Sequence, residues 1–245
     1  MLSIIYGEAL KLKRSKMLWL IVLGALLPVV LNYFVARHQI GDAKSIVWQQ
    51  LFQENLMLLV ALMGPALFAL FTGYIFAREY TERTINSFLT VPRSRVLLLL
   101  GKYVIMLPVI VATIALSFGL TLVSGFILRH EPLTVDALQD AGLRYLILIA
   151  TQYALISVAA TVSLFGKSYI PAMGLGVFAV ISELTIMQSK YIMYYPWSAP
   201  LNLVMENFSP TFNNTALGVT VLAIAFFLPL LFNIAYYRRA DVHSG

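Results

Sequence analysis

The stretch FAREYTERTINSFLTVPRSRVLLLLGKY, residues 76–103, places a charged segment between two long apolar runs. The run before it ends near residue 77, and the run after it begins near residue 96. An apolar run of about 20 residues is long enough to cross the roughly 30 Å hydrocarbon layer of a membrane as a helix. Apolar runs that alternate with charged segments therefore predict an all-α membrane protein.

The composition of the whole chain agrees with a membrane protein. Of its 245 residues, 60% are hydrophobic and 11% are charged, whereas a soluble domain carries about 25% charged residues. The sequence contains no cysteine, which excludes disulfides, thiolate metal sites and a cysteine nucleophile. The net charge of +6 is interpreted as a record of membrane topology and not as a nucleic-acid-binding surface.

The apolar runs predict six transmembrane helices in a single domain, 1–245. Their approximate ranges are 17–36, 55–77, 103–128, 144–165, 169–187 and 216–237. The third run begins as early as Val96, and the resulting 33 residues are too long for one span. We therefore expect Lys102 to mark the cytoplasmic edge of the membrane and residues 96–101 to belong to the preceding interfacial element.

The distribution of Lys and Arg predicts the orientation of the spans, because these residues are enriched in cytoplasmic segments. With the N-terminus inside, 12 basic residues fall on the inner side and five on the outer side. The inner residues are Lys11, Lys13, Arg14, Lys16, Arg78, Arg83, Arg93, Arg95, Lys102, Lys167, Arg238 and Arg239. The outer residues are Arg37, Lys44, Arg129, Arg144 and Lys190. Both termini are therefore predicted to be cytoplasmic.

Two segments at the inner side have the pattern of amphipathic helices. In residues 2–15, LSIIYGEALKLKRS, apolar side chains recur at helical spacing, which predicts an interfacial helix before the first span. Residues 79–91 contain no Gly or Pro, and Pro92 supplies a stop. The alternatives are a basic tail that only sets topology in the first case and a loop helix that only anchors the spans in the second.

Glu183 is the only acidic residue inside a predicted span. At about 1.5 Å per residue from Tyr169 it lies about 21 Å deep, in the outer half of the membrane. A charge inside the membrane costs about 2.5–3.5 kcal/mol on insertion scales, so such a residue faces protein or a wet cavity and is a functional candidate. The alternative is a structural carboxyl, either protonated or hydrogen-bonded to Ser, Thr or Tyr on a neighbouring helix.

Residues 188–215 are too apolar for a free loop and contain too many prolines to span the membrane. A re-entrant or interfacial hairpin on the outer face is predicted, with Tyr194, Tyr195 and Trp197 at the level of the lipid headgroups. These rings are either part of a substrate path or ordinary membrane-belt aromatics. Ala172 and Gly176 form a small-x-x-x-small pair, which serves either dimer packing or packing within the chain.

Several catalytic motifs are absent from the sequence. There is no G-x-x-x-x-G-K-[ST], H-E-x-x-H or G-x-S-x-G, and the three histidines lie in predicted loops and tails. No ATP site of the P-loop type, catalytic residue or metal site is therefore expected in this chain.

Residues 78–103, REYTERTINSFLTVPRSRVLLLLGKY, resemble the segment after the second span of ABC-2-type transporter permeases. In that family an acid-aromatic-x-acid/Asn-x-Thr start leads through an apolar helix to a Pro-x-Ser/Arg-Arg stretch and a Gly-Lys pair. Residues 8–31, EALKLKRSKMLWLIVLGALLPVVL, are similar to the start of the same proteins, particularly the bacitracin-export and lantibiotic-immunity branch. The resemblance extends in layout over the whole chain, and the first 105 residues carry most of its specificity.

The resemblance implies a type V exporter-like permease of the bacterial cytoplasmic membrane, which is a transport subunit and not an enzyme. ATP and Mg would be bound by a separate ATPase present in two copies, so no cofactor is expected in this chain. The partners implied are a second permease, identical or similar, the membrane lipid, and an amphipathic substrate such as a peptide antibiotic or a lipid-like molecule. In such permeases a cytoplasmic coupling helix fits a cleft on the ATPase, and the matching positions here are Glu79, Tyr80, Glu82, Arg83, Thr84 and Phe88.

Resembling permeases also carry short external helices where the substrate leaves, which makes Glu183, Tyr194, Tyr195 and Trp197 candidates for a substrate path. Two other functions remain open. The chain is alternatively a secondary transporter that uses Glu183 as a proton or ion site, or a membrane scaffold or receptor without a transport cycle.

Overall fold

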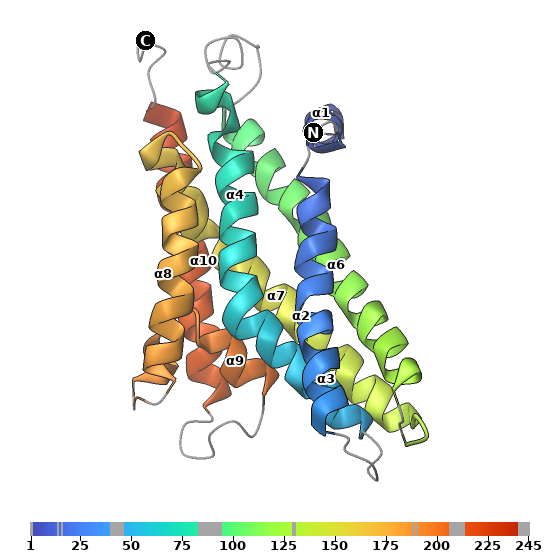
Figure 1. The fold of residues 1–245 in the computed structure, drawn as a ribbon. Helices are drawn as coiled ribbons and strands as arrows, with labels where there is room; N and C mark the ends of the chain where they lie inside the picture. The colour runs from blue at the N-terminus through green and yellow to red at the C-terminus, as the bar shows by residue number, and fades with distance from the viewer. Residues whose placement is uncertain are drawn as a thin grey trace.

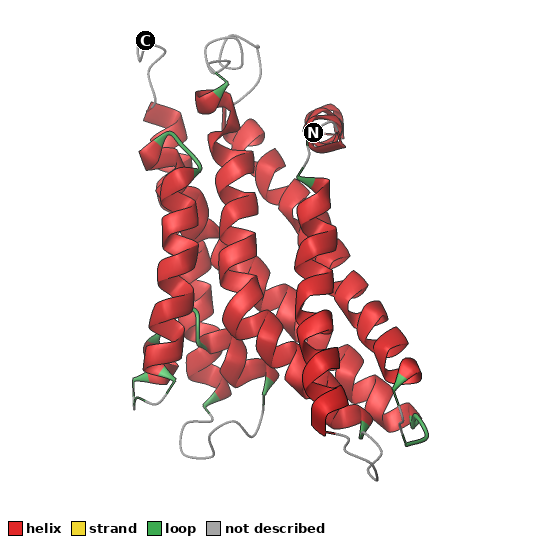
Figure 2. Cartoon of the chain, viewed as in Figure 1, coloured by secondary structure: helices red, strands yellow, loops and turns green. Residues whose placement is uncertain are grey.

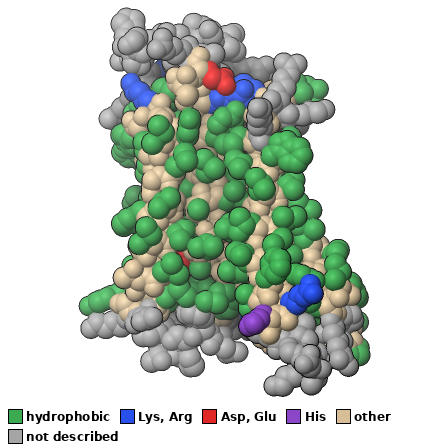
Figure 3. All heavy atoms as spheres, viewed as in Figure 1, with side chains coloured by type: hydrophobic (Ala, Val, Ile, Leu, Met, Phe, Trp, Pro, Cys, Tyr) green, Lys and Arg blue, Asp and Glu red, His purple; other side chains and the backbone are tan. Residues whose placement is uncertain are grey.

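The computed structural model describes residues 2–13, 15, 17–39, 47–82, 95–128, 131–187, 189, 191–205 and 214–239. Every regular element in this part of the chain is a helix, as Figures 1 and 2 show. In Figure 3, hydrophobic side chains cover the middle of the visible face, and Lys and Arg lie near its two ends. This banded surface is that of a helix bundle surrounded by lipid, which confirms the predicted all-α membrane fold.

Within the described residues, five helices are long and apolar enough to cross a membrane. Two of them, α2 and α10, have nearly the predicted lengths, and the other three are longer than predicted. The five are α2 (Leu18–Gln39), the continuous run of α3 (Trp48–Leu58), η2 (Leu59–Met63) and α4 (Gly64–Thr81), α6 (Arg95–Ile127), α7 (Val135–Gly166) and α10 (Thr215–Arg239).

Helix α6 corrects the predicted start of the third span. It runs without a break from Arg95 for 33 residues, about 50 Å at 1.5 Å per residue. The side chain of Lys102 is fully buried between helices, and its position at the membrane edge stays a prediction. The prediction that residues 96–101 form part of a separate element is wrong, because they belong to the same continuous helix as the span that follows.

The fifth predicted span, 169–187, is helix α8 (Ile170–Ile186), which is apolar but only 17 residues long. It follows α7 directly. Lys167 closes α7 in the left-handed conformation at φ 47°, and Pro171 stands in the first turn of α8. This tight turn reverses the chain, and α8 packs against both α7 and α4.

The contact between α8 and α4 is made by small residues. The buried residues of α8 are Ala172, Gly176, Ala179 and Glu183, which form one stripe along the helix. A Cβ added at Gly176 would lie 3.1 Å from Ala66 Cα and 3.1 Å from Ala69 Cβ, both on α4. The Ala172–Gly176 pair therefore serves packing within the chain, which resolves the alternative that the sequence left open.

Polar side chains in the middle of the bundle bind each other across helices. Asn55 Oδ1 accepts hydrogen bonds from the Tyr145 hydroxyl at 2.8 Å and from Ser117 Oγ at 3.2 Å, which joins α3, α7 and α6. Asn233 Nδ2 on α10 donates to the Tyr103 hydroxyl on α6 at 3.0 Å. Lipid offers no hydrogen-bonding partner, so pairs of this kind fix which helix faces pack together.

The segment between α8 and α10 is folded back onto the bundle. It contains η3 (Ile192–Tyr194) and α9 (Ala199–Val204), and α9 packs against α7 and α10. Arg144 on α7 donates to the carbonyl of Val204 at 2.7 Å, which holds the end of α9. The short broken helices agree with the expected hairpin, whose depth in the membrane stays a prediction.

Helix α1 (Leu2–Lys13) lies across one end of the bundle and packs against α6. The end of α4, the start of α6, the α7–α8 turn and the end of α10 lie at this same end in Figure 1. The segments that were predicted to be cytoplasmic are thus brought together, and the candidate site lies among them.

Candidate functional site

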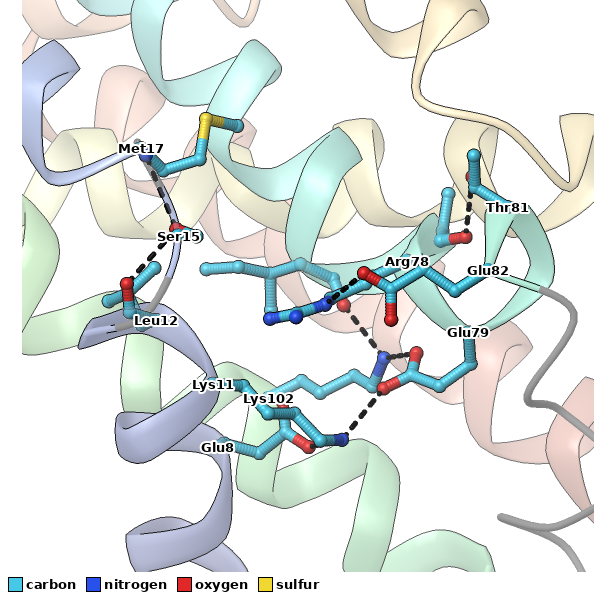
Figure 4. Close-up of polar contacts among 12 residues, drawn as sticks. Glu8, Lys11, Leu12, Ser15, Met17, Arg78, Glu79, Thr81, Glu82 and Lys102 are labelled. Carbon is cyan, nitrogen blue, oxygen red and sulfur yellow. Dashed lines mark hydrogen bonds and ion pairs between the residues drawn. The ribbon is translucent and has the colours of Figure 1, made fainter.

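Four charged side chains from three helices meet where α1 crosses the bundle. They are Glu8 and Lys11 on α1, Glu79 on α4 and Lys102 on α6, and we call them the ion cluster (Figure 4). Lys11 and Glu79, which are directly bonded, are 68 residues apart in the sequence. The cluster exists only because α1, α4 and α6 converge at this end of the molecule.

Glu79 and Lys102 form the buried centre of the ion cluster. Lys102 is 0% exposed and Glu79 is 3% exposed, and their side chains form a salt bridge. Lys102 Nζ also donates to the carbonyl of Ile75 at 2.7 Å, one turn before Glu79 on α4. Two buried charges are tolerated only when they are paired and hydrogen-bonded, and both conditions are met here.

Lys11 links this centre to α1. Its Nζ lies 2.6 Å from Glu8 Oε1 within α1 and 3.2 Å from Glu79 Oε1 on α4. Glu79 thus accepts from Lys102 with one carboxylate oxygen and from Lys11 with the other. A movement of the end of α4 would therefore act directly on α1 through Lys11 and on α6 through Lys102.

The charges around Lys11 determine the pH range in which Lys11 links α1 to Glu79. Burial opposes the charged form of Lys11, but the hydrogen bond to Glu8 and the charges of Glu8 and Glu79 outweigh it and raise the pKa of Lys11 above 10.5. A group whose pKa is higher in the folded than in the unfolded state contributes its full stabilisation at pH values below the unfolded-state pKa. This stabilisation is lost as the pH rises through the folded-state pKa.

We expect Lys11→Met to lower the free energy of unfolding by less than about 1 kcal/mol, since the side chain is partly exposed and screened by solvent. The difference from the unsubstituted protein should be constant between pH 7 and 9 and should disappear above the raised pKa. Unfolding in detergent at several pH values measures this. A difference that persists at strongly alkaline pH would show that Lys11 contributes by packing and not by charge.

Of the six predicted coupling residues, the structure describes Glu79, Tyr80 and Glu82. Glu79 faces the interior and is not presented at the surface, whereas Tyr80 is partly buried and packs against the hydrophobic core. Glu82 ends α4, is 48% exposed at its side chain, and pairs with Arg78 at 2.8 Å. Arg83, Thr84 and Phe88, with the rest of the predicted helix 79–91, lie outside the described residues.

The residues predicted to form a substrate path lie near the C-terminal end of α8, where Glu183 stands. Glu183 is 0% exposed, and neither carboxyl oxygen has a hydrogen-bond partner among the described residues. The preceding residue, Ser182, shares a hydrogen bond with the Tyr195 hydroxyl, and the Tyr195 ring lies 5.5 Å from that of Trp197. Tyr194 is exposed. The structure thus brings Glu183, Tyr195 and Trp197 into one region and leaves Tyr194 at its surface.

The environment of Tyr195 is consistent with a hydroxyl that stays protonated. Burial raises its pKa above 10.0, the hydrogen bond with Ser182 lowers it, and the charge of Glu183 raises it further. Sequence reasoning missed Ser182 because a serine in an apolar helix usually bonds to its own backbone, which Ser182 also does at Phe178 and Ala179.

The sequence also did not reveal the roles of Glu8, Lys11 and Lys102 in the ion cluster. One local signal existed: Glu8 and Lys11 are spaced three apart on a helix, a spacing that allows an ion pair. Their contact with α4 has no such signal. In the part of the chain that the structure describes, no three His, Cys, Asp or Glu side chains gather as metal ligands would.

Comparison with known proteins points to a family. The sequence profile of the ABC-2 family transporter proteins matches residues 4–183. The bacitracin transport permease protein BCRB of Bacillus licheniformis is 28% identical to the chain over 196 residues, which are 80% of this chain and 94% of that protein. The profile match includes all four residues of the ion cluster and ends at Glu183.

Proposed function

The chain belongs to the ABC-2 family of transporter proteins, as a multi-pass membrane permease and not the ATPase, and we propose that it exports, or extracts from the membrane, an amphipathic substrate such as a peptide antibiotic. The proposal rests on the similarity of the chain, over most of its length, to a bacitracin transport permease. ABC-2 permeases work with ABC ATPase partners, which supply the energy. The specific arrangement proposed is two ATPase subunits with two permeases, either identical or similar.

The proposed topology has six spans, with α8 as the fifth, and both termini in the cytoplasm. The Lys and Arg asymmetry of 12 to five supports this orientation. The convergence of α1, the end of α4, the start of α6 and the end of α10 at one end of the bundle also supports it (Figure 1). Helix α1 would lie along the inner membrane surface, and residues 188–215 would form the outer hairpin.

The proposed coupling segment is residues 79–91, with different roles for its two parts. Glu79 would transmit motion, because its carboxylate is bonded to α6 and α1 inside the protein. The residues that would contact the ATPase directly follow the end of α4 in the sequence: Glu82, Arg83, Thr84 and Phe88. ATP binding in the partner would thus move α4, α6 and α1 together and open the path between the two permeases alternately to each side.

Replacing residues 83–91 with an unrelated amphipathic helix should abolish co-purification with the cognate ATPase and ATP-dependent transport. Within the native segment, Phe88→Ala should weaken assembly by about 2 kcal/mol and Glu82→Ala by less, because a buried aromatic anchor outweighs a rim charge. The measurement is co-purification followed by ATPase and transport assays in reconstituted vesicles.

The matched control is Phe178→Ala, which removes an exposed ring from α8, outside the proposed coupling segment, and should leave assembly unchanged. Tyr80→Ala is a second comparison, because it should reduce stability and not assembly alone. If the replaced segment still binds the ATPase and supports coupled transport, the coupling proposal is wrong.

Glu183 favours one alternative function. A buried carboxyl without a hydrogen-bond partner among the described residues is a candidate proton or ion site. A secondary transporter would use it without ATP. Transport driven by a proton gradient in vesicles that contain the permease alone would support this alternative over the ATPase-coupled exporter.

A further inference from the structure

Two successive residues of α6 bind different neighbouring helices. Lys102 belongs to the ion cluster and forms a salt bridge with Glu79 on α4. The hydroxyl of the next residue, Tyr103, accepts a hydrogen bond from Asn233 Nδ2 on α10 at 3.0 Å. The backbone carbonyl of Tyr103 accepts another from the Tyr153 hydroxyl on α7 at 3.2 Å. Successive residues of a helix point about 100° apart, so this turn of α6 joins α4 to α7 and α10.

The ring of Phe76 on α4 packs against both of these α6 residues. Phe76 is fully buried and lies three residues before Glu79. Its ring centroid is 5.0 Å from that of Tyr103, edge to face, and 5.8 Å from Lys102 Nζ. Protein interiors are close-packed. A movement of the end of α4 that displaces Glu79 therefore also displaces the Tyr103 ring.

Asn233 is the polar contact of the C-terminal half of α10. Its side chain is fully buried, whereas the nearby Leu228 and Leu231 are mostly exposed. Lipid offers no competing hydrogen-bond partner, so the bond to Tyr103 fixes which face of this half of α10 meets α6. Pro229 lies one turn before Asn233 and lacks the backbone N–H of a regular helix, which allows α10 to bend at this point.

The N-terminal half of α10 packs against α9. Leu222 and Ala225 on α10 form a buried apolar cluster with Ala199 on α9 and Leu155 on α7. Helix α10 thus runs from α9 at one end of the bundle to the end where α1 lies (Figure 1). It is in contact with α9 on one side of Pro229 and with α6 on the other.

Two buried polar atoms at the junction of α6, α7 and α10 have no hydrogen-bond partner among the described residues. They are Asn233 Oδ1 and Ser157 Oγ, and Ser157 lies on α7 beside the Tyr103 hydroxyl. A buried polar atom without a partner is unfavourable. A small rotation of α10 against α6 that lets the Tyr103 hydroxyl donate to either atom gives the junction a second arrangement, which coupling between distant sites requires.

From these contacts we infer that Tyr103 and Asn233 are positioning residues of the transport cycle. Their hydrogen bond carries movement of the ion cluster from α6 to α10, and α10 carries it to α9 at the opposite end of the bundle. The inference rests on the proposed function, in which the ATPase moves the end of α4. It adds the route by which that movement reaches the region of the predicted outer hairpin.

The test uses the full chain with its cognate ATPase in nanodiscs. Because the protein has no cysteine, Val123→Cys on α6 and Thr215→Cys on α10 give a unique pair of exposed sites for spin labels. The distance between the labels is measured with and without ATP and Mg. We expect ATP to populate a second distance. Tyr103→Phe together with Asn233→Leu should reduce this ATP-dependent change about fivefold, the lower end of typical couplings between sites.

The double substitution separates coupling from stability. Replacing both partners of a hydrogen bond by apolar groups of similar shape is nearly neutral, so the variant should keep its thermal stability and its bound ATPase. The matched control is Asn55→Leu, which removes an equally buried asparagine whose hydrogen bonds join α3, α6 and α7 and not α10. This control should lower thermal stability but keep the ATP-dependent change in distance.

A second arm needs no ATPase. In the permease alone, Glu79→Met with Lys102→Met breaks the ion cluster and should change the same label distance. This change should disappear when Tyr103→Phe and Asn233→Leu are also present. Failure of the ATPase to bind would contradict the proposed function, and this arm would still decide the inference.

Four results would overturn the inference. In the presence of ATP, these are an unchanged distance in the otherwise native complex, a full change in the Tyr103→Phe, Asn233→Leu variant, and an equal loss of the change in Asn55→Leu. In the permease alone, the fourth is a label distance that does not respond to loss of the ion cluster, or that responds equally without the Tyr103–Asn233 hydrogen bond.

Discussion

Lys102→Met should lower the free energy of unfolding by about 3–5 kcal/mol, because removing one partner of a buried ion pair leaves the other charge uncompensated. Lys102 is fully buried and binds both Glu79 and the carbonyl of Ile75. Methionine has a similar length, so the loss measures the charge and not a cavity. Equilibrium unfolding of the purified permease in mixed detergent is the measurement.

The pair Arg78 and Glu82 supplies the matched control. These residues lie on the same turn of α4 as Glu79 and form a salt bridge at 2.8 Å, but the Glu82 side chain is 48% exposed. Arg78→Met should cost less than about 1 kcal/mol, as measured for exposed ion pairs. Equal losses in the two variants would mean that the burial of Lys102 does not govern its contribution.

The double substitution Glu79→Met, Lys102→Met separates stability from function. Replacing both members of a buried pair by apolar residues of similar volume is often neutral, so most of the lost stability should return. The link from α4 to α6 and α1 would still be broken. If the ion cluster transmits motion, the double variant should be folded and bind the ATPase but show reduced transport per ATP hydrolysed.

Gly176→Leu should lower the free energy of unfolding by about 1–3 kcal/mol, the second large effect expected. A Cβ at this position would already lie 3.1 Å from the backbone of α4, at Ala66 Cα and at the carbonyl oxygen of Pro65. Backbone atoms cannot move aside as a side chain can, so α8 must separate from α4. Thermal unfolding monitored by loss of helix signal measures the effect.

Gly174→Leu is the control for this substitution. It lies on the same helix, and a Cβ at this position meets no atom within 4 Å. Both variants gain the same helix propensity over glycine, so the difference between them isolates the contact with α4. Equal losses of stability in the two variants would show that the contact between Gly176 and α4 does not stabilise the fold.

Much of the fold was predictable because hydropathy and charge are properties of short segments. The apolar runs predicted the five long helices and the shorter α8. The Lys and Arg pattern assigned to one side of the membrane the segments whose described parts meet at one end of the bundle. Helix ends were predicted less well. The third span was predicted to begin at residue 103, whereas α6 begins at Arg95, because the apolar residues 96–101 were assigned to a separate element.

The candidate site was predicted only in part, for a related reason. Glu79 was singled out as a surface contact, and Lys102 as the edge of a span, but nothing in their local sequence pairs them. Glu183, the only acid inside a predicted span, is fully buried, and its position inside the membrane stays a prediction.

The sequence by itself determined that this protein is a helical membrane permease, which segments are apolar, and where its charges are concentrated along the chain. Only the tertiary structure decided that Glu79 binds both Lys102 and Lys11, and that the stripe from Ala172 to Glu183 faces α4. The physical reason is that the partner of a side chain depends on how each helix is rotated about its axis. That rotation is set jointly by small-residue contacts and interhelical hydrogen bonds between segments far apart in the chain.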